Sequence, residues 1–293
     1  MKRIALRSNP GRGLGWLVMV AFLALLGAAS ALSAQECLIV KGKGSDMIGR
    51  IEAALLKGAA PPCAAWKTLE ISGDALADFA KVQQAAREVD IVVALGTDAA
   101  KGVRSLKKNR KVGLMIPNGL ECACCMQVIS LYPDLRQVYG YLKKRTFTSL
   151  VLVYTSETAE KAFHLSMTGR EMGMDVTPVA VESPLDVPTR LRKGLDKAQG
   201  VLIAIDPKFF DEEFLKLMMD EIRRSGKPVF AFLKVFLDHG ADVAFTVEEA
   251  DMAREVMARL KEPPENGIFE VKSFFVKTGK SAKGDWTDEK IAQ

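Results

Sequence analysis

Short apolar runs alternate with amphipathic stretches along most of the chain. The run 90–96, DIVVALG, is continuously apolar, which is typical of a strand buried on both faces of a parallel sheet. Further β-type runs lie at 37–42, 66–72, 111–117, 149–155, 175–183, 200–206, 227–233, 241–247 and 268–279. Stretches of helical spacing separate most of them, at 47–57, 75–88, 97–108, 134–144, 156–173, 188–198, 210–225 and 248–261.

The chain contains two successive series of alternating strands and helices, which predicts an α/β fold with two doubly wound parallel-sheet lobes. We expect the first lobe at 37–126 plus 248–279, the second at 127–247, and a polar C-terminal tail at 280–293. Ligands of such sheets bind outside the carboxyl ends of the strands. In two lobes those ends face each other across a cleft, which a hinge can close.

The N-terminal residues 1–34 have a different pattern. Four basic residues, Lys2, Arg3, Arg7 and Arg12, precede an apolar run at 14–32, and small residues crowd the end of that run. This order predicts a secretory signal peptide that is cleaved after export to the periplasm. Uncleaved, the run is long enough to anchor the protein in a membrane.

Removing this segment changes the charge balance. The full chain has a formal net charge of +5, and residues 1–34 carry four basic residues and no acidic one. The remainder is therefore about +1, which argues against a nucleic-acid partner because such proteins need a basic footprint.

Several segments resemble one family. The stretches ISLYPDLRQVYGYLKK, SLVLVYTSETAEKAF, GREMGMDVTPVAVES and GVLIAIDPKFF, with SGKPVFAFLKVFLDHGADVAF, are similar to ABC transporter substrate-binding proteins of the tryptophan/tyrosine type. The resemblance covers most of residues 37–279. It implies a type I periplasmic binding fold and an extracytoplasmic protein that hands a small solute to an ABC permease and its ATPase.

The chain departs from the family's usual sequence in three segments: CACCMQVIS, TVEEADMARE and SFFVKTGKSA. These segments belong to the expected cleft, so the identity of the solute cannot be carried over from the family. We expect an amino acid-like solute or a small organic acid.

The ends of the expected strands supply the candidate ligand-binding residues, because topology places the site there. Near Thr97, a hydroxyl and the unpaired amides at a helix start would favour an anionic group of the ligand. The full set is Ser45, Thr97, Asp98, Asn118, Tyr154, Thr155, Ser156, Asp206, Phe232 and Lys234. Some of these residues would instead serve as helix caps and turns.

Catalysis has no support in the sequence. The two histidines, His164 and His239, lie in an expected helix and an expected turn. No nucleophile elbow, P-loop or H-E-x-x-H motif occurs. We therefore expect a binding protein without a cofactor rather than an enzyme.

Two of the five cysteines, Cys37 and Cys63, begin or precede neighbouring expected strands. Their Cα atoms would lie close enough for a disulfide, and an oxidising compartment favours it. The bridge would lie at the amino ends of the strands, away from the cleft.

The other three cysteines, Cys122, Cys124 and Cys125, form one cluster. They could form a local disulfide, remain thiols, bind a soft metal such as Cu(I), or act in redox chemistry. A periplasmic copper or redox protein is therefore the alternative function. We expect this loop at the mouth or wall of the cleft, because it marks the expected first crossing between the lobes.

Overall fold

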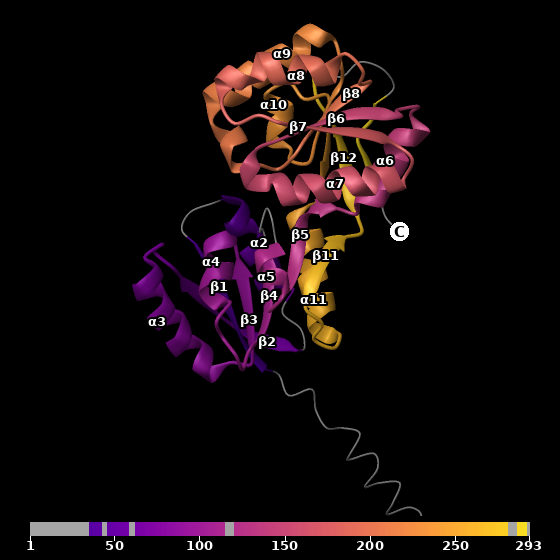
Figure 1. Cartoon of the computed structure of the whole chain (residues 1–293). Helices are drawn as coiled ribbons and strands as arrows, with labels where there is room; N and C mark the ends of the chain where they lie inside the picture. The colour runs from indigo at the N-terminus through magenta and orange to yellow at the C-terminus, as the bar shows by residue number, and fades with distance from the viewer. Residues whose placement is uncertain (1–34, 43–45, 59–61, 115–119, 281–285, 292–293) are drawn as a thin grey trace, which may run out of the picture.

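Two α/β lobes, one above the other, make up the molecule (Figure 1). The computed structural model describes residues 35–42, 46–58, 62–114, 120–280 and 286–291. The predicted fold class, with two mainly parallel sheets, is confirmed. The expected signal peptide at 1–34 lies outside the described residues.

The first lobe has a six-stranded parallel sheet of order β11-β5-β4-β3-β1-β2. Its β1-β3 pairing buries continuous apolar runs, as the pattern of β3 predicted. The strands are β1 (Gln35–Lys41), β2 (Cys63–Glu70), β3 (Ile91–Leu95), β4 (Arg110–Leu114), β5 (Gln127–Pro133) and β11 (Gly267–Val271).

The second lobe has a seven-stranded sheet of order β13-β12-β10-β9-β8-β6-β7. Its strands are β6 (Ser149–Tyr154), β7 (Asp175–Ala180), β8 (Gly200–Ile203), β9 (Val229–Ala231), β10 (Val243–Thr246), β12 (Phe274–Thr278) and β13 (Glu289–Ile291). The first five are parallel, whereas β12 and β13 add an antiparallel edge.

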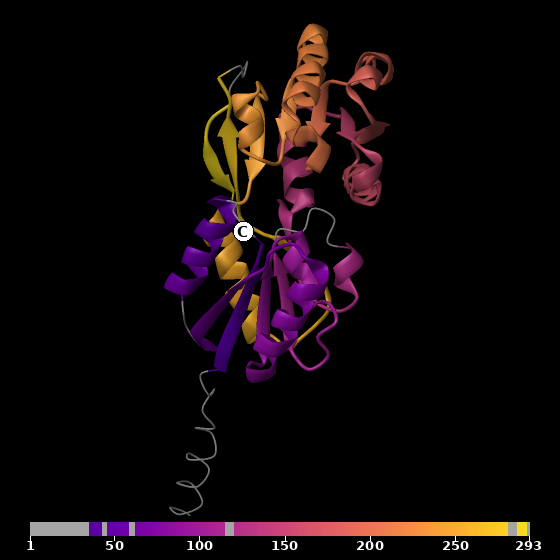
Figure 2. The ribbon, with the colours of Figure 1, turned by 90° about the vertical axis from the view of Figure 1, so that its left-hand side faces the viewer.

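Helices cover the faces of both sheets (Figures 1 and 2). The first lobe carries α2 (Asp46–Lys57), α3 (Ala75–Ala85), η1 (Ala86–Glu88), α4 (Thr97–Val103), α5 (Leu120–Ala123) and α11 (Glu249–Lys261). The second carries α6 (Leu135–Lys144), η2 (Ser156–Thr158), α7 (Ala159–Glu171), η3 (Pro184–Asp186), α8 (Val187–Leu195), η4 (Pro207–Phe210), α9 (Glu212–Ser225) and α10 (Val235–Asp238).

The chain passes between the lobes after β5, after β10 and after β11, so the predicted lobe boundaries need correction. We expected the second lobe to begin at residue 127, but β5 belongs to the first sheet because it pairs with β4. The expected strand 268–279 is two strands: β11 pairs with β5, and β12 pairs with β10 in the other lobe.

The C-terminal segment is not simply the polar tail that we expected at 280–293. Strand β13 pairs with β12 and closes the edge of the second sheet. Trp286 packs on Tyr141 and Phe147 with ring centroids about 6 Å apart. Strand β13 has only three residues, which is too short for an alternating pattern to be recognised in the sequence.

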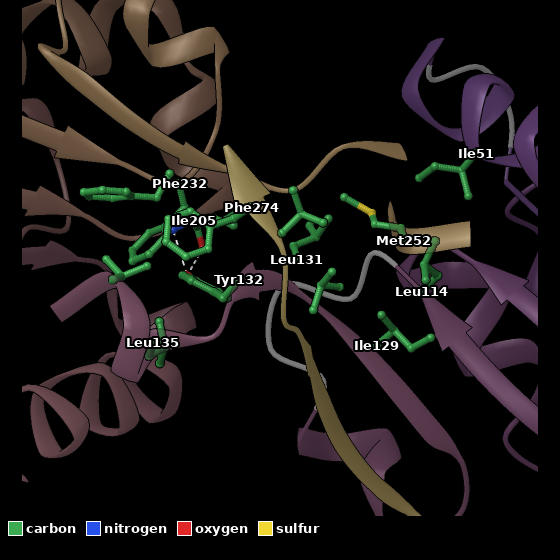
Figure 3. Close-up of a cluster of buried hydrophobic side chains, with 14 of the residues drawn as sticks. Ile51, Leu114, Ile129, Leu131, Tyr132, Leu135, Ile205, Phe232, Met252 and Phe274 are labelled. Atoms are coloured by element: carbon green, nitrogen blue, oxygen red, sulfur yellow. Dashed lines mark hydrogen bonds between the residues drawn. The ribbon is translucent and has the colours of Figure 1, made fainter. Parts of the chain in front are cut away.

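A hydrophobic core runs from one lobe into the other along the crossing segments (Figure 3). Leu131 and Tyr132 at the end of β5 lie next to Ile205 and Phe232 of the second lobe, while Met252 lies on the first-lobe side. The lobes are therefore joined by packed apolar side chains as well as by connecting chain.

The expected Cys37–Cys63 disulfide is present, with the Cα atoms 5.5 Å apart. It joins β1 to the start of β2 and lies in the buried core of the first lobe. Among the described residues, no helix is both long and apolar enough to cross a membrane.

Candidate functional site

A cavity of about 900 Å³ lies between the two lobes, at the carboxyl ends of strands from both sheets. We call it the interlobe cleft. The first lobe lines it with Met47, Ile48, Arg50, Gly96, Thr97, Leu131, Glu248, Glu249 and Met252. The second lobe and the crossing after β10 line it with Ile205, Phe210, Phe232, Leu233, Lys234, Val235, Thr246, Val247 and Lys277.

Apolar side chains make up most of the cleft wall. Phe232 is buried and packs edge-to-face on Tyr132, with ring centroids 4.7 Å apart. The Tyr132 hydroxyl accepts a hydrogen bond from the Ile205 amide at 2.8 Å and lies 3.4 Å from the Ile205 carbonyl oxygen (Figure 3). Burial raises the pKa of Tyr132, so the phenol keeps its proton and can donate it to the Ile205 carbonyl oxygen. The Tyr132–Phe232 pair therefore joins the end of β5 to the second lobe.

Charged groups are few at the cleft and come from both sides. Arg50 of α2 and Glu249 of α11 form an ion pair at 2.8 Å within the first lobe. Lys277 lies 3.9 Å from Asp288 in the second lobe. Lys234 is exposed and forms no ion pair within the described chain. It is therefore the cationic group best able to meet an anionic solute.

The turn from β3 into α4 brings backbone close to the cleft. Gly96 has a φ of 96°, and its amide donates to the Leu114 carbonyl oxygen at 2.8 Å. A Cβ there would lie 3.4 Å from Ile48. Glycine allows this turn, which leaves Thr97 at the cleft wall.

Three of the predicted ligand-binding residues, Thr97, Phe232 and Lys234, line the cleft. Ser45 and Asn118 lie outside the described residues. Asp98 is exposed in the first turn of α4, and Tyr154 is half-buried against the core, neither on the cleft wall.

Asp206 and Thr155 are turned into the second lobe rather than toward the cleft. Asp206 is fully buried. One carboxylate oxygen accepts from the Thr155 amide at 3.0 Å, from the Thr155 hydroxyl at 2.8 Å and from Thr158. The other oxygen accepts from the Lys208 amide at 3.0 Å. These groups join the ends of β6 and β8 and have little hydrogen-bonding capacity left for a ligand.

Ser156 is likewise committed to a neighbour. Its amide and hydroxyl donate to the Glu182 carboxylate at 2.7 and 2.8 Å, and Lys208 lies 3.3 Å from the same group. This network lies at the rim of the second lobe. In this lobe the serine, threonine and aspartate at the strand ends therefore bind neighbouring protein groups. Their positions in the sequence could not tell this role from ligand binding.

The cleft residues that the sequence did not single out come mainly from α2 and from the start of α11. Arg50, Glu249 and Met252 belong to helices that looked like ordinary amphipathic coverings. The available signal was indirect: α11 follows a crossing between lobes, and its first turn must therefore face the gap.

The three clustered cysteines do not lie at the cleft, which corrects our expectation. They occupy α5 and the turn before β5, next to Gly267 at the amino end of β11. The turn lies beside the amino ends of β5 and β11, whereas the cleft lies at the carboxyl ends of the strands. Cys122 is buried in the core, Cys125 is partly buried, and Cys124 is exposed.

The cysteine cluster lacks the geometry of a metal centre. Across the described ranges, no three side chains of histidine, cysteine, aspartate or glutamate are placed to hold a metal ion. Burial raises the pKa of the Cys125 thiol, which reduces its thiolate fraction. Neither observation supports the copper or redox alternative.

Comparison with known proteins gives a structural likeness and no likeness of sequence. No family model matches the chain, and no curated protein matches it. A ligand-free, open substrate-binding protein with adhesive properties from Clostridium difficile is similar over 84% of this chain and 92% of its own, with a TM-score of 0.65 and 9% identity.

An ABC domain in complex with L-Trp from Streptococcus pneumonia matches over 80% of this chain and 89% of its own, with a TM-score of 0.51 and 15% identity. A LacI family regulator from Weissella paramesenteroides with bound sucrose gives a TM-score of 0.51 at 10% identity, over 83% of this chain and 96% of its own.

The chain has a periplasmic-binding-protein-like fold. This likeness, with its two lobes, accounts for the position of the cleft at the strand ends. Two of these three proteins hold a small ligand, L-Trp or sucrose, the third is ligand-free, and none is described as an enzyme. At such low identity the likeness shows the fold alone and leaves the ligand open.

Proposed function

We propose that the protein is an extracytoplasmic solute-binding protein of an ABC-type uptake system. It traps a small solute, amino acid-like or a small organic acid, in the interlobe cleft and passes it to a permease with its ATPase. Its place of action is the periplasm, reached through the signal peptide predicted at 1–34 and consistent with the Cys37–Cys63 disulfide.

The single observation that carries the proposal is the composition of the cleft. A volume of about 900 Å³ suits a small molecule. Its wall is mostly apolar, and Lys234 and Thr97 supply a cation and a hydroxyl from opposite lobes. A solute with an apolar body and a carboxylate would contact both lobes at once, and it would therefore favour the closed arrangement.

The test is a screen of thermal stability with amino acids and small organic acids, followed by calorimetric titration of any hit. A solute that binds the folded state raises the melting temperature by mass action. We expect Lys234→Met to weaken binding of the hit roughly tenfold or more, since a charge-assisted hydrogen bond is lost. Lys216→Met, an exposed position on α9, is the matched control and should bind like the unchanged protein.

Two results would contradict the proposal. One is a panel of such solutes with no stabilising member, and the other is a hit whose affinity is the same in Lys234→Met. Small-angle scattering adds a second readout, because a trapped solute should reduce the radius of gyration as the lobes close.

A further inference from the structure

A second cavity, of about 520 Å³, also lies between the lobes and shares no lining residue with the interlobe cleft. Helix α7 of the second lobe forms one side, and β11 and α11 of the first lobe form the other. We call it the α7–α11 cavity. Its lining residues are Asp134, Leu135, Lys161, His164, Thr168, Glu255, Arg259, Ile268, Phe269, Glu270 and Lys272.

Lys161 is the unusual member of this lining. It is a lysine on α7 with only 5% of its surface exposed. Its ammonium nitrogen lies 4.0 Å from Glu270 and 4.5 Å from the Tyr132 ring centroid, and it makes no hydrogen bond within the described chain. Burial lowers the pKa of Lys161. Glu270 is its nearest carboxylate, and at 4.0 Å it leaves N–H donors of the mostly buried ammonium available to an acceptor in the cavity.

The acidic groups of the cavity already have donors. Asp134 caps α6 by accepting from the Arg136 and Gln137 amides. Glu255 accepts from Arg259, and Glu270 accepts from the Leu135 amide at 3.2 Å. Burial raises the pKa of Glu270, and its carboxylate lies 4.0 Å from the Lys161 ammonium, beyond hydrogen-bond distance. The nearest carboxylates therefore leave the ammonium of Lys161 incompletely satisfied.

Two further basic side chains, Arg259 and Lys272, line the cavity. Arg259 lies in the cavity wall beside Phe269, with its guanidinium 4.6 Å from that ring centroid. Neither Lys272 nor His164 forms an ion pair within the part of the chain that the structure describes. An acceptor that entered the cavity would meet Lys161, Lys272 and Arg259, whose guanidinium also pairs with Glu255 and Glu262.

We propose that the α7–α11 cavity is a second ligand site, which takes a small oxyanion with a carboxylate or phosphate group on Lys161. The anion would bridge the lobes, because Lys161 belongs to the second lobe and Arg259 to the first. A bridging anion alters the free energy of lobe movement, so it is thermodynamically coupled to solute binding in the interlobe cleft.

The test uses the protein from residue 35 onward in a chloride buffer at constant ionic strength. Inorganic phosphate and acetate are titrated in separate arms, which distinguishes the two oxyanion chemistries, and binding is followed by melting temperature and calorimetry. We expect a saturable rise in melting temperature in at least one arm. Lys161→Met should weaken that binding roughly tenfold or more, and Lys161→Arg should largely retain it.

Controls separate this site from the cleft. Lys216→Met and Lys234→Met should both keep the oxyanion response, whereas only Lys234→Met should lose solute affinity. The stability of Lys161→Met in chloride is measured first, because the variant removes a buried charge and also the nearest cation of Glu270. Should it fail to fold, Lys161→Arg and Arg259→Gln report on the same site, and Arg259→Gln should weaken the oxyanion response.

The proposal is overturned if neither oxyanion gives a saturable response, or if the response is unchanged in Lys161→Met. A response that disappears in Lys234→Met instead would place the oxyanion in the interlobe cleft. That result would overturn the second site and leave the proposed solute-binding function standing.

Discussion

Asp206 lies at the end of a strand, where ligand-binding residues are expected, but it stabilises the second lobe and does not line the cleft. Its carboxylate accepts from two threonine hydroxyls and two backbone amides. The network ties the end of β8 to the start of η2 beneath the cleft. This buried network holds the chain next to the cleft residue Ile205, although Asp206 and the two threonines do not line the cleft themselves.

We expect Asp206→Ala to lower the free energy of unfolding by about 3 kcal/mol, because it leaves several buried donors without an acceptor. Denaturant unfolding followed by circular dichroism measures this change. Asp98→Ala is the control, since Asp98 is exposed and its loss should cost about 0.5 kcal/mol or less. Equal stability of the two variants, with solute binding lost only in Asp206→Ala, would instead place Asp206 in the site.

At the scale of elements, α8 and α9 are joined by a buried carboxylate. Glu221 of α9 is 4% exposed and accepts from Arg192 of α8 at 2.7 Å and from Arg224 at 2.8 Å. The hydrogen bond from Arg192 holds the pKa of Glu221 below its usual range. The folded state therefore binds this proton less readily than the unfolded chain does.

This depressed pKa gives a pH-dependent prediction. The stabilisation by Glu221 is fully present above the unfolded pKa of about 4.3 and is lost as the pH falls through the folded pKa. Glu221→Gln should therefore melt at a lower temperature than the unchanged protein at pH 7, and the gap should narrow at pH 3. The exposed Glu213→Gln in the first turn of the same helix should show a much smaller gap at pH 7, since only its interaction with the helix dipole is lost. A gap of equal size at both pH values would contradict the argument.

Elements with strong periodicity could be predicted from the sequence, and those held by long-range pairing could not. The apolar run of β3 and the amphipathic α9 were clear. The sheets to which β5 and β12 belong depended on their pairing with β4, β11 and β10, which the local sequence pattern does not contain. Within the site, Thr97 and Lys234 followed from topology. Arg50 and Met252 did not, because their helices reach the cleft only through the way the two lobes are joined.

At the scale of the whole molecule, the first lobe has one covalent cross-link, and it lies far from the cleft. The Cys37–Cys63 bridge closes a loop with a sequence separation of 26. Reduction should lower the free energy of unfolding by about 3 kcal/mol, since the unfolded chain gains freedom. It should leave solute affinity within about twofold of the oxidised value.

The measurement compares unfolding and calorimetric titration with and without a reductant. The Cys37→Ala/Cys63→Ala variant is the control, because reductant should change its stability no further. A large loss of solute affinity on reduction, with the fold intact, would contradict the separation between cross-link and cleft.

The position of the other cysteines has a practical consequence. Cys124 is exposed in the turn beside the amino ends of β5 and β11, away from the cleft lining, while Cys122 in α5 is buried. A thiol-directed tether at Cys124 would hold the molecule on a sensor surface with its cleft turned toward the solution. A dye at the same thiol would be carried by the first lobe alone. Paired with a second dye on the other lobe, it would report opening and closing without obstructing the entry of a solute.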